Sequence, residues 1–195
     1  MGRKLIFTSF GLSTSMGRKL IGKEITKSAD LTNKKIFLFC EPYYSIEPIV
    51  VDACVKIGFK KENIFLSSQC EIDMILTADY IYLTEGNIFQ ILSILRERGM
   101  DNMIKEAYKN GATFIGASAG ALIAGVNIEE AFSFDRNNVG LSDYSGLALF
   151  DGIVIPHYTK AEMKEYIKNS PEIENRYKML FSVANDKILV LELED

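Results

Sequence analysis

A serine lies between small residues in the segment Gly116-Ala-Ser-Ala-Gly120. An apolar run typical of a strand precedes this segment, and an apolar run typical of a helix follows it. A serine on a sharp turn between a strand and a helix is the arrangement of a nucleophile elbow. Glycine and alanine suit such a turn because little bulk fits where neighbouring backbone packs closely. We therefore predict that Ser118 is the nucleophile of an acyl-transfer reaction, with the N–H of Ala119 as a donor to the oxyanion.

Two other interpretations of this segment remain open. Its small residues could serve only to pack the start of a helix. The turn could also hold a phosphate group, since glycine-rich turns before helices bind anions. The phosphate interpretation is the weaker one, because the segment lacks the Gly-Lys-Ser/Thr sequence of a phosphate-binding loop.

The chain contains one histidine, His157, and a nucleophilic serine needs a base. His157 follows an apolar run that predicts a strand, so it is expected at the carboxyl end of that strand. A lone histidine can also be a structural or surface residue. In open α/β sheets, however, the active site lies beyond the carboxyl ends of the strands. Ser118 and His157 are therefore predicted to meet at one edge of a sheet.

Short apolar runs alternate with amphipathic stretches along most of the chain. Strands are predicted at Leu5–Ser9, Lys35–Cys40, Asn63–Leu66, Tyr80–Thr84, Thr113–Ile115, Gly152–Ile155 and Ile188–Leu193. Helical spacing of apolar residues is clearest at Ile46–Ile57, Ile88–Leu95 and Met103–Tyr108. This alternation predicts the α/β class, with a parallel, doubly wound sheet between two layers of helices.

The chain has 195 residues and a net charge of −4, and 48% of its residues are apolar. This length predicts a single domain over residues 1–195, and the composition excludes intrinsic disorder. No apolar run approaches the ~20 residues that cross a bilayer, so no membrane partner is expected. Mild acidity and scattered Lys and Arg argue against nucleic acid as a partner. Three widely spaced cysteines form neither a disulfide framework nor a zinc pattern, which predicts buried reduced thiols in a cytoplasmic protein. No cofactor is expected.

Three segments of the chain resemble the S51 family of serine peptidases, whose members include α-aspartyl dipeptidases. The first, Tyr80–Leu92, is similar to the strand-Gly-Gly-Asn-Thr-Phe-helix segment of the family. The second, Gly111–Ala121, is similar to its nucleophile segment, and the third, Ile155–Tyr158, to its Pro-His-Tyr sequence. The order and spacing of the three segments agree with the family, whereas the N-terminal third of the chain matches only in its alternating pattern.

The resemblance implies a flavodoxin-like fold related to class I glutamine amidotransferases. It implies that Ser118 is the nucleophile and His157 the general base, and that N–H groups near Gly86 and Ala119 form the oxyanion hole. It also implies that the substrate is a small peptide and that no metal takes part. Three polar residues are expected beside the substrate: Glu85, Asn87 and Asp135.

The chain departs from the family in three places. Glu85 stands where the family has a second glycine, so its carboxylate could crowd the oxyanion or bind a substrate amine instead. Ile88 replaces the threonine of the family segment. After Pro-His-Tyr, the stretch Thr159–Tyr166 lacks the arginine tied to a preference for N-terminal Asp, so aspartyl specificity does not carry over. Lys160 or Lys164 could take the place of that arginine, or lie on the surface of a helix.

A catalytic histidine needs a third group that orients it. The resemblance places the family's acid just before the final strand. Asp186 is the first candidate, because it is an acid that enters this strand. Asp135, in a loop region, is the second, and Glu192, inside the final strand, is the third.

These observations together predict a serine hydrolase that cleaves dipeptides or small amides. The alternative is a catalytically impaired protein of the same fold that binds a small peptide or an amino acid, as Glu85 and the uncertain acid suggest. A cysteine-centred site at Cys40 is a further alternative, although Cys40 lacks a glycine-rich elbow. The oligomeric state is left open.

Overall fold

The computed structural model describes residues 2–27, 29–41 and 45–194. Six strands form the main sheet, in the order β3-β2-β4-β5-β1-β8. They are β1 (Arg3–Thr8), β2 (Ile36–Phe39), β3 (Ile64–Leu66), β4 (Tyr80–Leu83), β5 (Thr113–Ala117) and β8 (Ile188–Leu193). Neighbouring strands run parallel except at the edge, where β8 is antiparallel to β1. The predicted α/β sheet is therefore present, with an antiparallel edge strand that the alternating pattern did not reveal.

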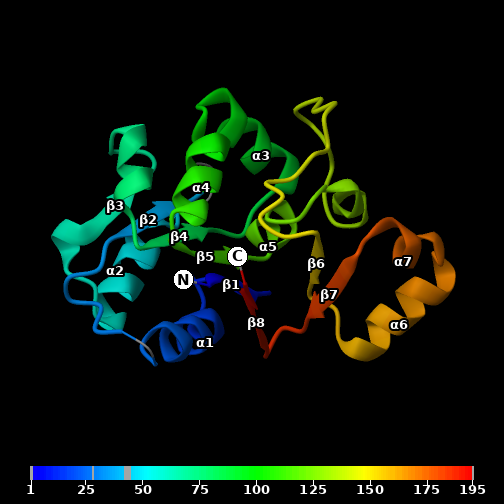
Figure 1. Cartoon of the computed structure of the whole chain (residues 1–195), viewed down its shortest axis with the longest axis horizontal. Helices are drawn as coiled ribbons and strands as arrows, with labels where there is room; N and C mark the ends of the chain where they lie inside the picture. Colours follow the sequence, from blue (N-terminus) through cyan, green and yellow to red (C-terminus); the bar gives the residue numbers. More distant parts are fainter. Residues whose placement is uncertain (1, 28, 42–44, 195) are drawn as a thin grey trace.

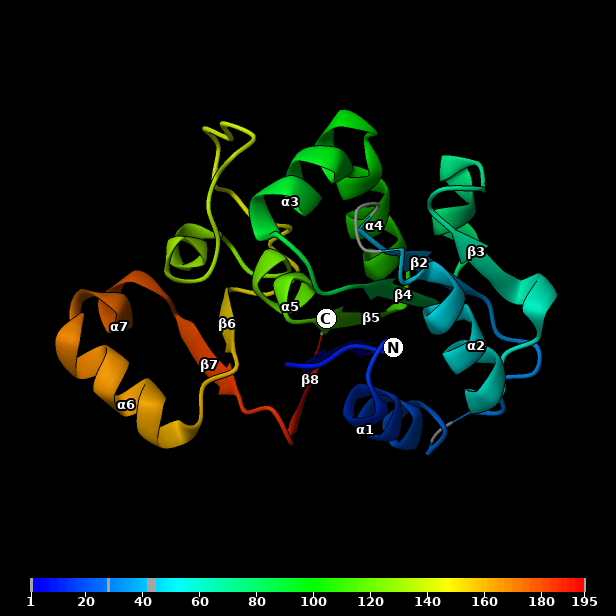
Figure 2. The same ribbon diagram turned by 180° about the vertical axis from the view of Figure 1, so that it is seen from behind.

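Helices cover both faces of this sheet. The α-helices are α1 (Ser15–Ile25), α2 (Glu47–Ile57), α3 (Ile88–Glu97), α4 (Met100–Lys109), α5 (Ala119–Ile123), α6 (Lys160–Asn169) and α7 (Glu172–Arg176), and short 3-10 helices cover Lys61–Asn63, Ile72–Thr77 and Glu129–Ser133. Helices α1 and α2 lie on one side of the sheet, and α3, α4 and α5 lie on the other (Figure 1). The same layers are seen from behind in Figure 2. Among the residues described, no helix combines the length and the apolar character needed to cross a membrane.

The core consists of two apolar layers, one on each face of the sheet. Successive side chains of a strand point to opposite faces, so one strand feeds both layers. In β1, Leu5 and Phe7 belong to the layer under α3 and α4, whereas Ile6 belongs to the layer under α1 and α2. All three side chains are fully buried. Continuous apolar strands such as β1 are thus explained by a sheet that is covered on both sides.

A second, two-stranded sheet stands beside the main one (Figure 1). It pairs β6 (Gly152–Pro156) in parallel with β7 (Met179–Val183), and helices α6 and α7 connect the two strands. The strand before His157 was predicted in the same sheet as Ser118, and this is wrong, because β6 belongs to the second sheet. The strand β7 was not predicted. Four of the five residues of β7 are only partly buried, so the segment carries a weak apolar signal. The prediction of one domain over residues 1–195 stays a prediction.

Candidate active site

Ser118 occupies a strained turn between β5 and α5. Its backbone angles are φ 49° and ψ −107°, a left-handed conformation that is unfavourable for a residue with a side chain. The N–H of Ser118 donates to the carbonyl of Thr8, which ends the neighbouring strand β1, at 2.9 Å. A Cβ atom on Gly116 would lie 2.6 Å from the carbonyl oxygen of Gly120. The small residues of this segment therefore allow the close backbone contacts that hold the serine outward.

The side chains of Ser118 and His157 meet at the carboxyl edge of the sheets. Ser118 Oγ lies 2.9 Å from Nε2 of His157, within hydrogen-bond distance. Both residues are partly exposed. An unprotonated Nε2 at this distance can take the hydroxyl proton during attack on a carbonyl. An interpretation of the elbow as packing alone, or as a phosphate cradle, does not account for this pairing.

His157 is held by contacts from the end of β1. The hydroxyl of Ser9 donates to the carbonyl of Val183 at 2.6 Å and accepts from the N–H of His157 at 2.8 Å. The ring of Phe10 meets the imidazole edge-on, with ring centroids 5.7 Å apart. His157 itself has a positive φ of 68°. Ser9 thus ties β1 to the ends of both β6 and β7, a role that its place at the end of a predicted strand does not reveal.

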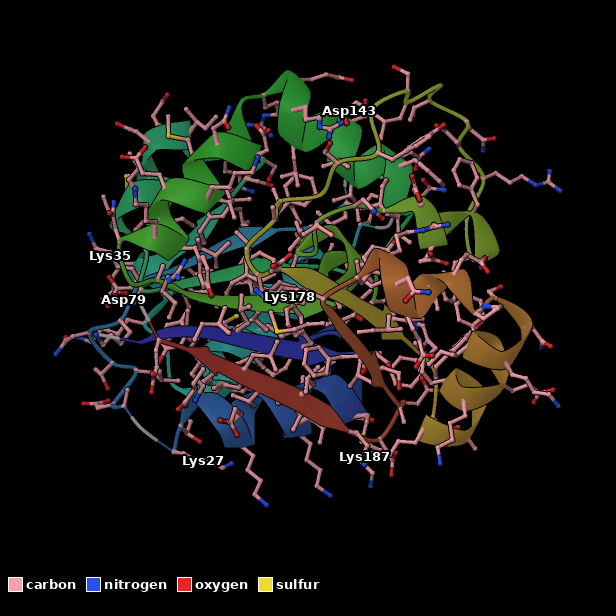
Figure 3. The ribbon with its side chains drawn as sticks, turned by 45° about the vertical axis from the view of Figure 1, so that its right-hand side comes forward. Lys27, Lys35, Asp79, Asp143, Lys178 and Lys187 are labelled. Atoms are coloured by element: carbon pink, nitrogen blue, oxygen red, sulfur yellow. The ribbon has the colours of Figure 1, made fainter. Side chains whose placement is uncertain are left out.

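The third group at the site is an amide. Nδ1 of His157 lies 2.8 Å from Oδ1 of Asn185, in the turn between β7 and β8. Asp186, the first candidate for this place, instead pairs with Lys187 at 3.1 Å, and its side chain is 63% exposed. Figure 3 labels Lys187 in this turn. Asp186 was predicted because it is an acid. The turn instead directs Asn185, the residue before it, at His157, so the prediction of Asp186 is wrong.

The other two acids lie elsewhere. Asp135 accepts a hydrogen bond from the N–H of Ile88 at 2.8 Å, at the start of α3. Burial raises the pKa of the Asp135 carboxyl. Glu192 lies within the edge strand β8, and its exposed carboxylate is 3.7 Å from Nζ of Lys4. In the described chain, neither acid hydrogen-bonds to His157.

Two backbone N–H groups are available to an oxyanion. The N–H groups of Gly86 and Ala119 form no hydrogen bond with another residue in the described ranges. Gly86 has φ 147°, and a Cβ atom there would lie 1.8 Å from Oε2 of Glu41. A glycine is therefore required at this position. An oxyanion hole needs donors without internal partners, and the role of these two N–H groups as such a hole stays a prediction.

Glu85 is turned toward the loop between β1 and α1. Its carboxylate accepts hydrogen bonds from three hydroxyls: Ser13, Tyr82 at 3.2 Å and Thr84 at 3.1 Å. A Cβ atom on Gly11 would lie 1.9 Å from Oε2 of Glu85, so the glycine makes room for this carboxylate. These bonds fix its position instead of leaving it free in solvent.

Asn87 has a structural position. Its Oδ1 accepts from the N–H of Gln90 at 3.0 Å and so caps α3, while its Nδ2 donates to the carbonyl of Arg136 at 3.1 Å. The amide thereby ties the start of α3 to the loop that follows α5. Contact of Asn87 with a substrate stays a prediction.

The site at Cys40 lacks the properties of a nucleophile. Cys40 is 1% exposed, and burial raises the pKa of its thiol well above the usual range. The thiolate is the reactive form of cysteine, so this environment keeps Cys40 inert at neutral pH. The elbow at Ser118 is the better candidate.

Comparisons with known proteins agree with this geometry. The model of "Peptidase family S51" matches residues 49–195. An uncharacterised peptidase of Listeria monocytogenes is 39% identical over 89 residues, which cover 45% of this chain and 43% of that protein. Peptidase E of Escherichia coli O1:K1 is 34% identical over 113 residues, which cover 58% of this chain and 48% of that protein. The match thus spans about half the length of these curated relatives.

Solved structures resemble the whole of this chain. A peptidase E-type protein of Listeria monocytogenes EGD-e superposes with a TM-score of 0.73 at 23% identity, covering 100% of this chain and 96% of that one. A peptidase from an acI-B1 Actinobacterium gives a TM-score of 0.68 at 17% identity, covering 98% of this chain and 84% of that one. These similarities confirm the predicted flavodoxin-like α/β fold. Because the family model covers most of the sequence, this chain belongs to peptidase family S51.

Proposed function

We propose that this chain is a serine peptidase that cleaves dipeptides or other small amides. The observation that carries the proposal is the 2.9 Å contact between Ser118 Oγ and His157 Nε2 on a strained elbow. A strained backbone conformation costs free energy, and such conformations cluster at functional sites. Membership of family S51 supports the same reaction class.

The roles of the groups follow from their hydrogen bonds. Nδ1–H donates a hydrogen bond to Asn185 Oδ1, which leaves the lone pair of Nε2 directed at Ser118. The serine oxygen attacks the carbonyl carbon while Nε2 takes the hydroxyl proton. The N–H groups of Gly86 and Ala119 stabilise the oxyanion. The imidazolium then returns its proton to the leaving amine, and a water molecule, activated in the same way, releases the acid and restores the serine.

Peptide hydrolysis tests this proposal directly. The purified chain is incubated with dipeptides that begin with acidic, neutral or basic residues, and the release of free amino acid is measured. We expect cleavage of some of these peptides, with kcat lower by about a thousandfold or more in Ser118→Ala and in His157→Ala. Cleavage that persists at the wild-type rate in both variants would contradict the serine mechanism.

One observation favours the second candidate, an impaired protein that binds a small peptide. Asn185 is uncharged, so it stabilises the imidazolium less than an acid does. In that case, Ser118→Ala would bind dipeptides as tightly as the wild type, and neither protein would release amino acids. Calorimetric titration beside the hydrolysis assay separates the two functions. Cytoplasmic location stays a prediction.

A further inference from the structure

Three carboxylates surround Gly86 at the carboxyl edge of the main sheet. Glu41 follows β2, Glu85 follows β4, and Asp135 comes from the loop after α5. Glu85 and Asp135, together with Ile46 and Gly86, line a cavity of about 380 Å³. In the register of β4 and β5, Leu83 is paired with Gly116. The N–H of Gly120 donates to the carbonyl of Thr84 at 3.2 Å, so the residues that follow β4, Glu85 and Gly86 among them, lie beside the elbow.

Two of these carboxylates accept hydrogen bonds from consecutive backbone N–H groups. Oε2 of Glu41 accepts from the N–H of Asn87 at 3.0 Å, and Oδ2 of Asp135 accepts from the N–H of Ile88 at 2.8 Å. Helix α3 starts at Ile88, and the positive end of its dipole favours negative charge here. These bonds explain how two acids can lie close together, and they use one oxygen of each carboxylate.

The negative charge of the cluster is not balanced within the described chain. Glu41 is 1% exposed, and its Oε1 has no hydrogen-bond partner among the described residues. Burial raises the pKa of the Glu41 carboxyl, and the negative charge of Asp135 raises it further. Among the described residues, none of the three acids of the cluster forms an ion pair. A buried carboxylate oxygen without a partner costs free energy, and a bound cation would recover it.

Glu41 also faces free space beside the cluster. With Ser45, Glu47 and Pro48 it lines an adjoining cavity of about 340 Å³. The side chain of Glu41 therefore stands at the wall of a cavity, with its unpartnered Oε1 buried behind that wall.

Glu85 is held in place before any ligand arrives. Ser13, Tyr82 and Thr84 donate to its two oxygens. The Tyr82 hydroxyl accepts from the N–H of Leu12 at 2.9 Å, so its own proton is free to point at Glu85. A carboxylate fixed in this way binds a cation without first losing side-chain entropy.

We propose that this acidic pocket binds an alkylammonium group of the substrate, next to the bond that Ser118 attacks. The proposal rests on the proposed peptidase function. The ammonium belongs either to the N-terminal α-amine of the peptide or to a lysine side chain at the same residue. A peptide that begins with aspartate is disfavoured, because its side-chain carboxylate would meet three acids of like charge.

Matched dipeptides test the pocket in the wild-type chain. Lys-Ala and norleucine-Ala differ mainly in the side-chain charge, Asp-Ala reverses that charge, and Nα-acetyl-Lys-Ala removes the α-amine. We expect kcat/KM for Lys-Ala to exceed that for Asp-Ala by about tenfold or more. If the lysine side chain is the bound group, Lys-Ala also exceeds norleucine-Ala. If the α-amine is bound, the two are cleaved alike and acetylation abolishes cleavage.

The variant Glu85→Gln removes one charge and keeps the shape of the side chain. Its kcat/KM for Lys-Ala is expected to fall about tenfold, and the advantage of Lys-Ala over Asp-Ala is expected to shrink. Glu62→Gln is the matched control, because Glu62 is an exposed acid on a 3-10 helix away from the pocket. If Asp-Ala is cleaved as well as Lys-Ala, or if Glu85→Gln leaves all preferences as in the wild type, the proposal is overturned.

A binding measurement separates this proposal from the peptidase function. Calorimetric titration of Ser118→Ala with the same peptides needs no turnover. If Ser118→Ala binds Lys-Ala more tightly than Asp-Ala, and Ser118→Ala/Glu85→Gln does not, the pocket is supported even if nothing is hydrolysed. Equal binding of all four peptides overturns the proposal. If Glu85→Gln does not fold, Asp135→Asn replaces it, because its amide oxygen can still accept from Ile88 N–H, and the same outcomes apply.

Discussion

Asn185 shows how a single residue can tune this site. Its amide oxygen meets Nδ1 of His157 at 2.8 Å, where a serine peptidase commonly has a carboxylate. An amide oxygen fixes the ring tautomer as well as a carboxylate does. It carries no full charge, however, so it gives less stabilisation to the imidazolium that forms during attack. The geometry therefore gives His157 a weaker electrostatic support than a carboxylate would give.

Substitution of Asn185 tests this interpretation. In Asn185→Asp a carboxylate faces the same ring nitrogen, and we expect kcat/KM to rise by about tenfold to a hundredfold. In Asn185→Ala the ring loses its partner, and kcat/KM should fall by about tenfold. Both values are measured with a dipeptide that the wild type cleaves. Asp186→Asn distinguishes the two neighbours. If its kcat/KM falls as far as that of Asn185→Ala, Asp186 and not Asn185 orients His157.

At the scale of elements, the site depends on backbones that approach closely. The N–H of Gly120 donates to the carbonyl of Thr84 at 3.2 Å, which places the start of α5 against the end of β4. Ser9 plays a similar part between the two sheets, since it bonds to Val183 and His157. Ser118 and His157 are thus positioned by separate elements that these contacts hold together.

Gly120→Ala is expected to disturb the elbow. A Cβ atom at this position would lie 2.3 Å from the carbonyl oxygen of Leu83, and a backbone atom cannot move away cheaply. We expect the free energy of unfolding to fall by about 1–3 kcal/mol, measured by urea denaturation. Gly22→Ala in α1 is the control, because its Cβ would meet only the side chain of Ile57, at 3.2 Å. Equal stability of the two variants would contradict the predicted backbone clash.

Ser9→Ala is expected to weaken the junction between the sheets. The hydroxyl is buried, and its removal leaves the carbonyl of Val183 and the N–H of His157 without their partner. A loss of about 1–3 kcal/mol in the free energy of unfolding is expected, together with a lower kcat. Comparison with Ser93→Ala on the exposed face of α3 controls for loss of a hydroxyl. A Ser9→Ala chain as stable and active as the wild type would show that the hydroxyl does not position His157.

At the scale of the whole molecule, buried acids make stability depend on pH. Burial raises the pKa of the Glu41 and Asp135 carboxyls in the folded chain. The unfolded chain therefore holds fewer protons on these groups at the same pH. Their contribution to stability is present below the ordinary carboxyl pKa and is lost as the pH rises through the folded values. Glu24 has the opposite effect, because ion pairs with Lys27 and Lys4 lower its pKa.

Glu41→Gln is expected to reduce this pH dependence. The amide oxygen can still accept from the N–H of Asn87, but the group no longer loses a proton. The free energy of unfolding should fall less steeply than in the wild type as the pH rises above the ordinary carboxyl pKa. Glu24→Gln is the comparison, and it should lower stability at neutral pH and have little effect below the ordinary carboxyl pKa. Urea denaturation across this range gives both slopes, and a steeper fall in Glu41→Gln than in the wild type contradicts the assignment.

The sequence by itself determined the class of the fold and two side chains of the candidate site. Apolar runs that alternate with amphipathic helices specify a covered sheet, and small residues around Ser118 specify a tight turn. His157 could be assigned because a strand predicted before it placed it at an edge of a sheet. These inferences depend on local periodicity and on residue size, which a sequence displays directly.

Only the tertiary structure decided which polar group each of these residues meets. Asn185 rather than Asp186 faces His157, because the turn between β7 and β8 sets the direction of both side chains. The second sheet, the tie through Ser9 and the cluster at Gly86 join residues that are far apart in the chain. Local propensity carries no record of such contacts, since their geometry arises from the packing of whole elements.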